Sequence, residues 1–168
     1  MNDQFPKRKS IRLSEYDYSQ NGAYFVTICT QNRRRLLSQI HTVGAGVLDR
    51  PSVKLLPHGV VADKYIRQMN NFYDWLCVDA YVIMPNHIHL LLRIDNGRSG
   101  TPAPTKGNAL LERFVSTFKR FCNKEYGENI WQRSFHDHVI RDQSDYDDIY
   151  RYVENNPDQW ELDELYLP

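Results

Sequence analysis

The sequence predicts an α+β domain: a ferredoxin-like, RRM-like antiparallel sheet in the order β-α-β-β-α-β, with an added C-terminal helix. Three observations predict it. Runs rich in β-branched and aromatic residues mark four strands, and two longer segments with apolar residues at helical spacing lie between them. A Pro-Asn turn joins the second and third strands into a hairpin. The 168 residues, 41% hydrophobic and 25% charged, are enough for one domain, spanning residues 1–168, with its own core.

The first half of the chain supplies one strand and one helix. Residues 1–22 lack periodicity and are interpreted as an N-terminal arm, and residues 23–30 form the first strand. Residues 31–56 are weakly patterned and are interpreted as an insertion. Within it, a turn or short hairpin is expected at 43–47 and a loop at 49–52. A helix is predicted from about Pro57 to Asn70, with an apolar stripe of Val61, Tyr65 and Met69.

The second half begins with the hairpin. Residues 74–84 predict the second strand, which pairs across Pro85-Asn86 with a third strand starting at His87. Residues 95–107, rich in Gly, Pro, Ser and Thr, predict a mobile loop.

A long helix, a strand and a short helix follow that loop. The long helix spans residues 108–126, and the fourth strand spans 130–140. Ser144 is expected to cap a last helix from Tyr146 to about Asn155, which Pro157 stops.

Two histidines open the third strand. Side chains alternate along a strand, so His87 and His89 point to the same face, while Ile88, Leu90 and Leu92 point to the other. Their Cβ atoms then lie roughly 6–7 Å apart, which lets both imidazoles reach one divalent ion. A pair of hydrogen-bonded histidines on a half-buried strand is the plainer interpretation of this motif. A second such pair, His136 and His138, lies on the fourth strand, and we rank it as base, DNA contact or core residues before metal ligands.

The last helix offers partners for the histidine pair. Tyr152 and Asn156 lie one turn apart on the face that packs on the sheet, so a phenol and an amide oxygen can approach one ion. Tyr146 and Tyr150 fall off that face at roughly 100° per residue. A core aromatic is the alternative for Tyr152. Mg²⁺ or Mn²⁺ suits mixed imidazole and oxygen ligands with open positions.

Charge is balanced overall but polarised along the chain. The 21 basic and 21 acidic residues cancel, which argues against a non-specific nucleic-acid binder. The arm and the long helix nevertheless carry cations that can contact phosphates, whereas residues 137–168 are acidic. The candidate DNA-binding residues are Lys7, Arg8, Lys9, Arg12, Arg113, Arg120 and Lys124. Solvated surface is the alternative interpretation for each cluster.

Compartment signals favour the cytoplasm. No apolar run approaches the roughly 20 residues that span a bilayer, and the N-terminus lacks the apolar stretch of a signal peptide. Cys29, Cys77 and Cys122 have no CxxC spacing and are interpreted as free thiols. A monomer and a homodimer both remain open.

Several motifs resemble one family. Met84 to His89, followed by leucines, resembles the HUH (His-hydrophobic-His) motif of single-tyrosine transposases, especially the REP-associated tyrosine transposases. Residues 151–157 resemble that branch's Tyr-x-x-Asn-Asn-Pro helix. Shorter similarities at 8–18, 24–30, 131–133 and 156–160 extend the resemblance from about Arg8 to Trp160.

The resemblance implies a specific chemistry. It implies that Tyr152 is the nucleophile and that Asn156 takes the place of a polar metal ligand beside His87 and His89. It also implies a metal-dependent single-stranded DNA transesterase, which cleaves and rejoins hairpin-bearing DNA through a 5′-phosphotyrosine link. Two other classes stay open: a non-catalytic, domesticated nucleic-acid-binding domain, and a metal-dependent hydrolase using His87, His89 and an acid from elsewhere.

Overall fold

A computed structural model describes residues 21–41, 51–95 and 109–166. The elements are β1 (Gly22–Cys29), η1 (Gln31–Arg33), β2 (Ser38–His41), β3 (Ser52–Leu55), α1 (Pro57–Phe72), β4 (Leu76–Ile83), β5 (His87–Ile94), α2 (Ala109–Tyr126), β6 (His136–Ile140), α3 (Gln143–Asn155) and η2 (Asn156–Leu162). The expected arm at 1–22 except its last two residues, the hairpin at 43–47 and the loop at 95–107 except Asp95 lie outside the described residues.

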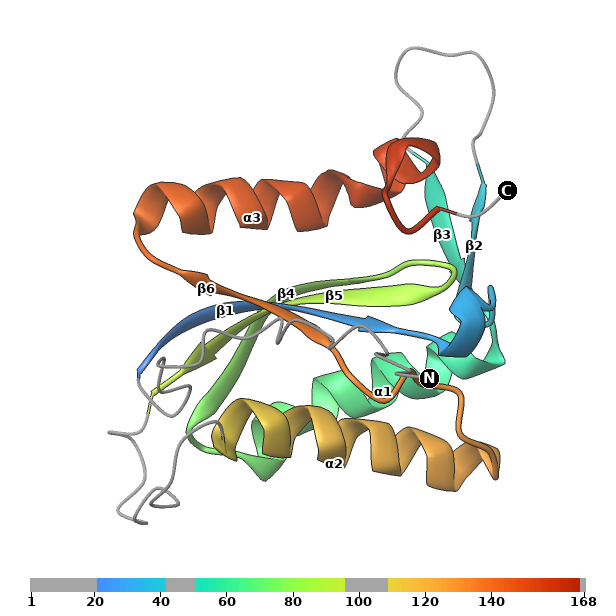
Figure 1. The fold of residues 1–168 in the computed structure, drawn as a ribbon, viewed down its shortest axis with the longest axis horizontal. Helices are drawn as coiled ribbons and strands as arrows, with labels where there is room; N and C mark the ends of the chain where they lie inside the picture. Colours follow the sequence, from blue (N-terminus) through green and yellow to red (C-terminus); the bar gives the residue numbers. More distant parts are fainter. Residues whose placement is uncertain (1–20, 42–50, 96–108, 167–168) are drawn as a thin grey trace, which may run out of the picture.

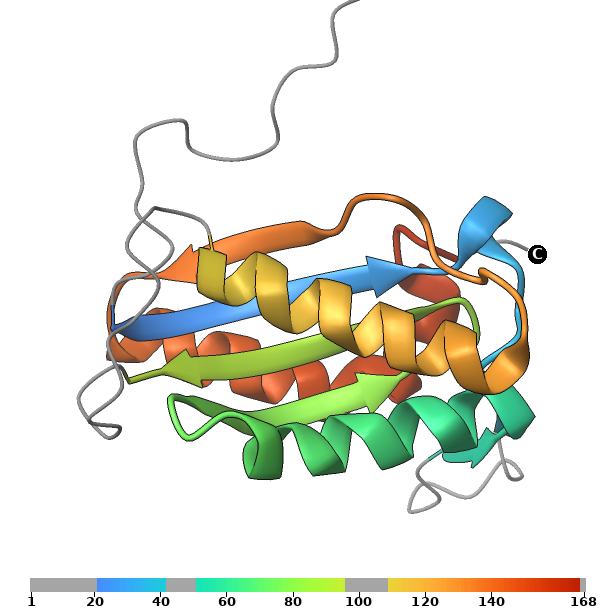
Figure 2. The same cartoon turned by 90° about the horizontal axis from the view of Figure 1, so that it is seen from below.

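A four-stranded sheet in the order β4-β5-β1-β6 forms the centre, with every neighbouring pair antiparallel. Helices α1 and α2 cover one face, and α3 lies across the other (Figure 1). Seen from the α1–α2 side, the two helices run along the sheet (Figure 2). This arrangement confirms the ferredoxin-like α+β fold with an added C-terminal helix.

The register of β5 separates two kinds of face. Ile88, Leu90, Leu92 and Ile94 are buried in the core beneath α1 and α2. His87 and His89 alternate with them and therefore face α3. The alternation predicted from the sequence thus places both imidazoles on the opposite face from the main core.

Helix α1 packs through a different stripe from the predicted one. Its buried residues are Gly59, Ala62, Ile66 and Met69, whereas Val61 and Tyr65 are only half-buried. Gly59 explains the rotation, because an added Cβ there would lie 1.9 Å from the carbonyl oxygen of Leu37. Because the backbone at Leu37 approaches so closely, only the side of α1 that carries small residues can face it.

The fourth strand is shorter than predicted. Residues 130–140 were expected to be strand, but β6 covers only His136–Ile140, and Trp131 forms an isolated bridge with Thr30. The ammonium of Lys119 donates to the carbonyl oxygens of Gln132 (2.8 Å) and Ser134 (2.9 Å), which removes them from the sheet ladder. The amide of Gln132 still donates to the carbonyl of Cys29 at 2.9 Å.

Two local expectations were also wrong. Helix α3 is capped by Asp142, whose side chain accepts from the amide of Asp145 at 2.9 Å, and not by Ser144. Ser52 belongs to β3 and not to the loop predicted at 49–52, of which residues 49 and 50 lie outside the described residues. Strands β2 and β3 form a separate two-stranded sheet. Strands of four residues are too short for a period of two to stand out.

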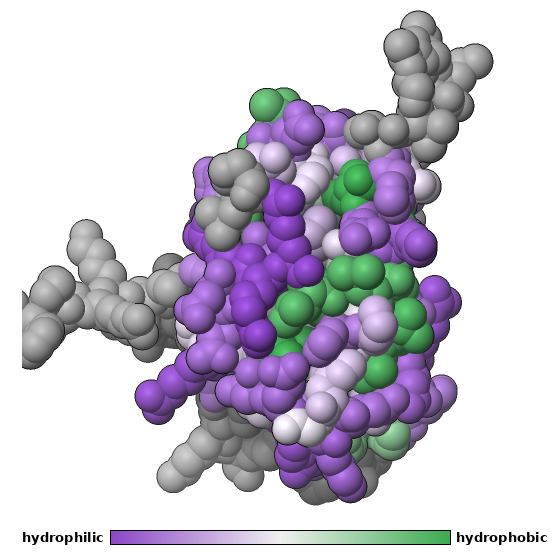
Figure 3. Space-filling model, turned by 90° about the vertical axis from the view of Figure 1, so that its right-hand side faces the viewer, coloured by the Kyte–Doolittle hydropathy of each residue, from purple (hydrophilic) through white to green (hydrophobic). Residues whose placement is uncertain are grey.

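The surface at the β2–β3 end is mostly hydrophilic, with apolar side chains gathered in one larger patch on the lower half of the view (Figure 3). Among the described residues, no helix combines the length and the apolar character needed to cross a membrane.

Candidate catalytic and metal site

The two histidines of β5 meet under α3. His87 and His89 are 0% and 3% exposed, and their Nε2 atoms lie 3.0 Å apart. The tight turn at Pro85-Asn86 starts the strand, and pairing with β1 and β4 on both sides fixes its backbone. Both imidazole edges therefore converge on one point from a rigid element.

Hydrogen bonds orient both rings. Asn86 donates from Nδ2 to the carbonyl of Leu165 (2.8 Å), so its Oδ1 faces Nδ1 of His87, also at 2.8 Å. An amide oxygen only accepts, hence His87 carries its proton on Nδ1 and presents a lone pair at Nε2. Nδ1 of His89 lies 2.8 Å from the hydroxyl of Thr27, which can either donate or accept. Such outer partners fix the orientation of metal-binding imidazoles.

The acidic tail supplies a third donor atom, a carboxylate oxygen. Oδ2 of Asp163 lies 3.8 Å from Nε2 of His87 and 4.0 Å from Nε2 of His89. The ligand atoms of these three side chains all lie within 4.8 Å of one another, close enough to hold one metal ion. The Leu165 amide donates to Oδ1 of Asp163 at 2.7 Å, and Asn156 Nδ2 donates to Oδ2 at 3.1 Å.

Sequence reasoning missed Asp163. It follows α3 and η2, where buried Trp160 anchors the tail against the ring of His87 at a centroid separation of 5.9 Å. No local spacing distinguishes it from the other acids of residues 137–168. Only the buried Trp160 nearby signals that this part of the tail packs on the domain.

The electrostatics favour a bound cation. Burial, and then the neighbouring His89, lower the pKa of His87 to about 3. Burial also lowers the pKa of His89, although Asp163 opposes it. Burial alone raises the pKa of Asp163, but the approach of His89, the Leu165 amide and His87 hold it well below its usual range. Two neutral imidazoles beside one carboxylate are the donor set of a divalent metal.

Tyr152 stands over this cluster. Its hydroxyl lies 3.4 Å from Nε2 of His89 and 3.4 Å from Oδ2 of Asp163. The ring contacts Phe25 and His89 edge-on, at centroid separations of 5.8 and 5.3 Å. The side chain is 39% exposed, which excludes the alternative of a core aromatic. Burial, followed by the charge of Asp163, raises the pKa of Tyr152 to about 12.

Asn156 lies beside the same cluster. It is 2% exposed, and its amide nitrogen donates to Asp163. Its Oδ1 is buried and has no hydrogen-bond partner among the residues that the structure describes. The sequence suggested Asn156 as the third ligand; the geometry adds the carboxylate of Asp163 beside it.

The other tyrosines of α3 lie away from the cluster. The hydroxyl of Tyr146 donates to Asp79 at 2.9 Å, and the ring of Tyr150 stacks on Tyr146 at 6.5 Å. Within the described ranges, the second histidine pair belongs to no group of three possible metal ligands, and His138 bonds to Asp145 at 2.9 Å. His136 pairs with Thr27, which pairs with His89, so it lies two strands away on the same face.

Four of the seven expected DNA-binding cations lie outside the described residues, and three lie on α2. Lys7, Arg8, Lys9 and Arg12 lie outside the described residues. Arg113, Arg120 and Lys124 are exposed on α2, on the other face of the sheet from the histidines. The structure therefore does not bring these three cations to the histidine–tyrosine cluster.

Comparisons with known proteins point to relatives in sequence and in fold. The chain is 31% identical, over 176 aligned positions, to an uncharacterised protein of Haemophilus influenzae, covering 95% of this chain and 93% of the relative. It is 26% identical to a REP-associated tyrosine transposase of Escherichia coli over 147 positions, 86% of this chain and 73% of the relative. No family model matches.

A solved structure, a REP-associated tyrosine transposase bound to a REP hairpin, shares the fold. Its TM-score is 0.60 at 19% identity, over 88% of this chain and 73% of that one. The expected resemblance thus holds in sequence and in three dimensions. The chain is a homologue of the REP-associated tyrosine transposases and has their fold.

Proposed function

We propose that the protein is a metal-dependent DNA transesterase that cleaves and rejoins single-stranded DNA at hairpin-bearing sequences through Tyr152. One observation carries the proposal: an exposed phenol stands 3.4 Å from both His89 and Asp163, at a cluster with the donor set of a divalent cation. The E. coli relative is a transposase, and the solved neighbour is bound to a REP hairpin, which supports DNA as the substrate class.

The bond changes at Tyr152 balance without an external energy source. The phenolic oxygen attacks phosphorus, the bond from phosphorus to the 3′-oxygen breaks, and a 5′-phosphotyrosine link forms. The phenol gives up one proton and the departing 3′-oxygen takes up one proton, so the strand leaves with a 3′-hydroxyl. The link keeps the energy of the phosphodiester, so attack by a 3′-hydroxyl rejoins the strand without ATP.

His87, His89 and Asp163 would hold the cation, with Asn156 supporting Asp163. Two imidazoles and one carboxylate fit Mg²⁺ or Mn²⁺, and the buried, unpartnered Oδ1 of Asn156 is a further oxygen at the same place. A bound divalent cation would supply Lewis-acid stabilisation of charge on the scissile phosphate. The chain itself orients the phenol through the ring contacts with Phe25 and His89.

The test is a covalent adduct. The protein is incubated with labelled hairpin oligonucleotides carrying single-stranded extensions, with and without Mn²⁺, and adducts are resolved on a denaturing gel. Tyr152→Phe should abolish the adduct. Tyr150→Phe is the matched control, because it removes a phenol of similar exposure, 37% against 39%, from the same helix.

The same gel separates the alternatives. A non-catalytic binding domain gives neither an adduct nor cleavage, and a hydrolase gives cleavage without an adduct. An adduct of normal yield from Tyr152→Phe would place the nucleophile elsewhere.

A further inference from the structure

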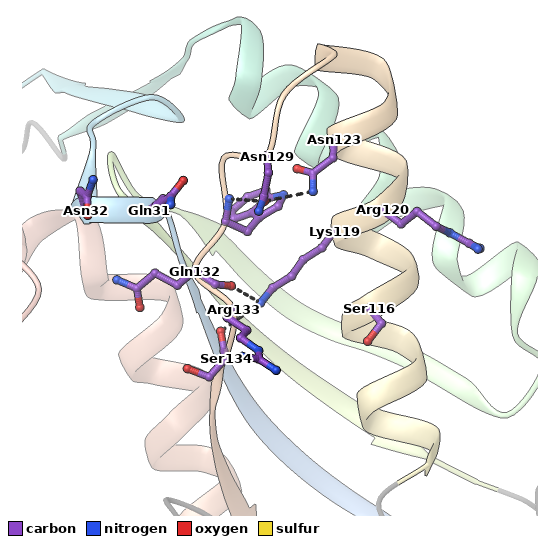
Figure 4. A pocket seen from close by; sticks show the side chains of 11 residues that line it. Gln31, Asn32, Ser116, Lys119, Arg120, Asn123, Asn129, Gln132, Arg133 and Ser134 are labelled. Carbon is purple, nitrogen blue, oxygen red and sulfur yellow. Dashed lines mark hydrogen bonds between the residues drawn. The ribbon is translucent and has the colours of Figure 1, made fainter. Parts of the chain in front are cut away.

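A large polar pocket lies away from the histidine–tyrosine cluster. It has a volume of about 830 Å³ and is lined by η1, α2 and the segment 129–134 that precedes β6. Figure 4 shows side chains from all three elements around it, with Lys119 reaching across from α2 to the carbonyl of Gln132. Its volume falls in the range of roughly 300–1,000 Å³ that small-molecule sites occupy.

The lining has the composition of an anion site that can also read a polar ring. Three of its eleven residues are cations, Lys119, Arg120 and Arg133, and none is acidic. Five more are carboxamides, from Gln31, Asn32, Asn123, Asn129 and Gln132. Each carboxamide offers both a donor and an acceptor, which is the pattern that matches the edges of nucleobases. A site for a phosphate alone would need the cations but not the carboxamides.

Several of these groups are not engaged within the fold. Among the described residues, no hydrogen bond or ion pair involves the side chains of Gln31, Asn32, Gln132 or Arg133. Trp131, 2% exposed, also lines the pocket, and its indole nitrogen is buried without a hydrogen-bond partner in the described part of the chain. A buried donor without a partner is costly, so a ligand that accepts from it would stabilise the site.

Other side chains hold the wall of the pocket in place. Lys119 ties Gln132 and Ser134 to α2 through their carbonyl oxygens. Asn129 accepts from the side chain of Asn123 at 3.1 Å and from the amide of Trp131 at 3.2 Å. The pocket is therefore preformed, and the unengaged side chains stand on a fixed frame.

We propose that this pocket binds one unpaired nucleotide of the DNA substrate. Its phosphate lies against Arg120 and Arg133, and its base edge contacts the carboxamides and the indole N–H of Trp131. A base-paired nucleotide would not enter, because its edge is already hydrogen-bonded to the opposite strand. The proposal rests on DNA being the substrate, as proposed above, but not on any chemistry at Tyr152.

The experiment measures binding alone, in a Tyr152→Phe background with a chelator present. The probes are a labelled DNA hairpin with a short single-stranded extension, the same hairpin with a blunt end, and a series of extended hairpins with one abasic position each. The variants are Arg133→Gln, Gln132→Ala and Trp131→Phe. Arg67→Gln is the control, since Arg67 is exposed on α1, pairs with Asp63 and does not line the pocket.

Each pocket variant should weaken binding of the extended hairpin about 10-fold, with blunt-hairpin binding unchanged and Arg67→Gln nearly neutral. One abasic position in the extension should lower the affinity of the parent protein by a similar factor. The same abasic position should hardly change the affinity of Gln132→Ala, because that variant already lacks the side chain that contacts the base. Equal losses on the blunt hairpin, or no difference from Arg67→Gln, would overturn the proposal. Failure of every probe to bind the parent protein would instead count against DNA as the substrate.

Discussion

The hydroxyl of Tyr152 and Nε2 of His89 lie 3.4 Å apart although 63 positions separate them in the chain. The contact exists because β5 presents His89 to the face that α3 crosses, while α3 turns Tyr152 down toward that face. A helix rotated by one residue would replace Tyr152 with Arg151 or Val153. The register of α3 therefore decides whether Tyr152 meets the histidine pair of β5.

The two histidines of the cluster should be indispensable for cation binding. His87→Ala or His89→Ala should lower Mn²⁺ affinity by more than about 100-fold and remove cleavage, because each deletes one of two donors fixed on a strand. Isothermal titration with Mn²⁺ measures the first effect. His138→Ala is the control, since His138 bonds to Asp145 outside the cluster. Unchanged Mn²⁺ affinity in either cluster variant would refute the site.

Asp163 should matter more than Asn156. Asp163→Ala removes the only carboxylate in the described triad and should lower Mn²⁺ affinity about as much as a histidine variant. Asn156→Ala removes a hydrogen bond to Asp163 and should cost about 10-fold. Glu164→Ala controls for the loss of a neighbouring negative charge. The reverse order of effects would make Asn156 the ligand and Asp163 its support.

Metal-free stability should fall on acidification from pH 7 to pH 5. Burial, followed by His89, holds the pKa of His87 at about 3, below the roughly 6.5 of an unfolded histidine. The unfolded chain therefore binds more protons in this window, and stability is present above the unfolded pKa and lost as the pH falls toward 3. Each such histidine contributes a slope of up to about 1.4 kcal/mol per pH unit.

Urea unfolding with a chelator at several pH values measures that slope. His87→Asn should flatten it, because the variant side chain does not titrate. Asp163 adds nothing to the slope between pH 7 and 5. Burial raises its pKa, but His89, the Leu165 amide and His87 outweigh burial and hold the pKa below its usual range. The stability that Asp163 contributes is therefore lost only below about pH 4, the pKa of an unfolded aspartate. A slope unchanged in His87→Asn would mean that another group titrates.

The cations of the arm and of α2 should contribute to phosphate binding. Neutralising one phosphate-contacting cation lowers the slope of log K against log salt by about 0.7 on single strands and weakens all sequences alike. Arg8→Ala/Lys9→Ala and Arg120→Ala/Lys124→Ala are compared on a hairpin and a scrambled oligonucleotide over a salt series. Unchanged slopes in both double variants would place the DNA on another surface; a loss confined to one sequence would mean base reading.

The histidine–tyrosine geometry was accessible from sequence because two regular periods carry it. His87 and His89 share a face at period two, and Tyr152 and Asn156 share one at helical spacing. Both periods depend only on the local backbone, so the folded structure keeps the side chains on the faces that the sequence predicts. The resemblance then connected a strand and a helix that no local rule relates.

Asp163 and the course of residues 130–135 were not accessible in this way. Asp163 reaches the cluster only because Trp160 buries itself beside His87, a contact between segments distant in sequence. The segment before β6 reads as strand by composition, yet Lys119 from another element takes its carbonyls. In α1, the approach of Leu37 to Gly59 decided which stripe turned inward. Tertiary contacts outweighed local preference at each place.

Cys29 joins two regions described separately: it pairs with His87 on one side, and its carbonyl accepts from the Gln132 amide on the other. Gln132, in the wall of the polar pocket, and His87 are thus neighbours of the same residue, roughly two strand spacings, or about 10 Å, apart across the sheet. A strand held in the pocket would reach Tyr152 after a fixed number of nucleotides. The end of β1 would then set the distance between the recognised nucleotide and the cleaved bond.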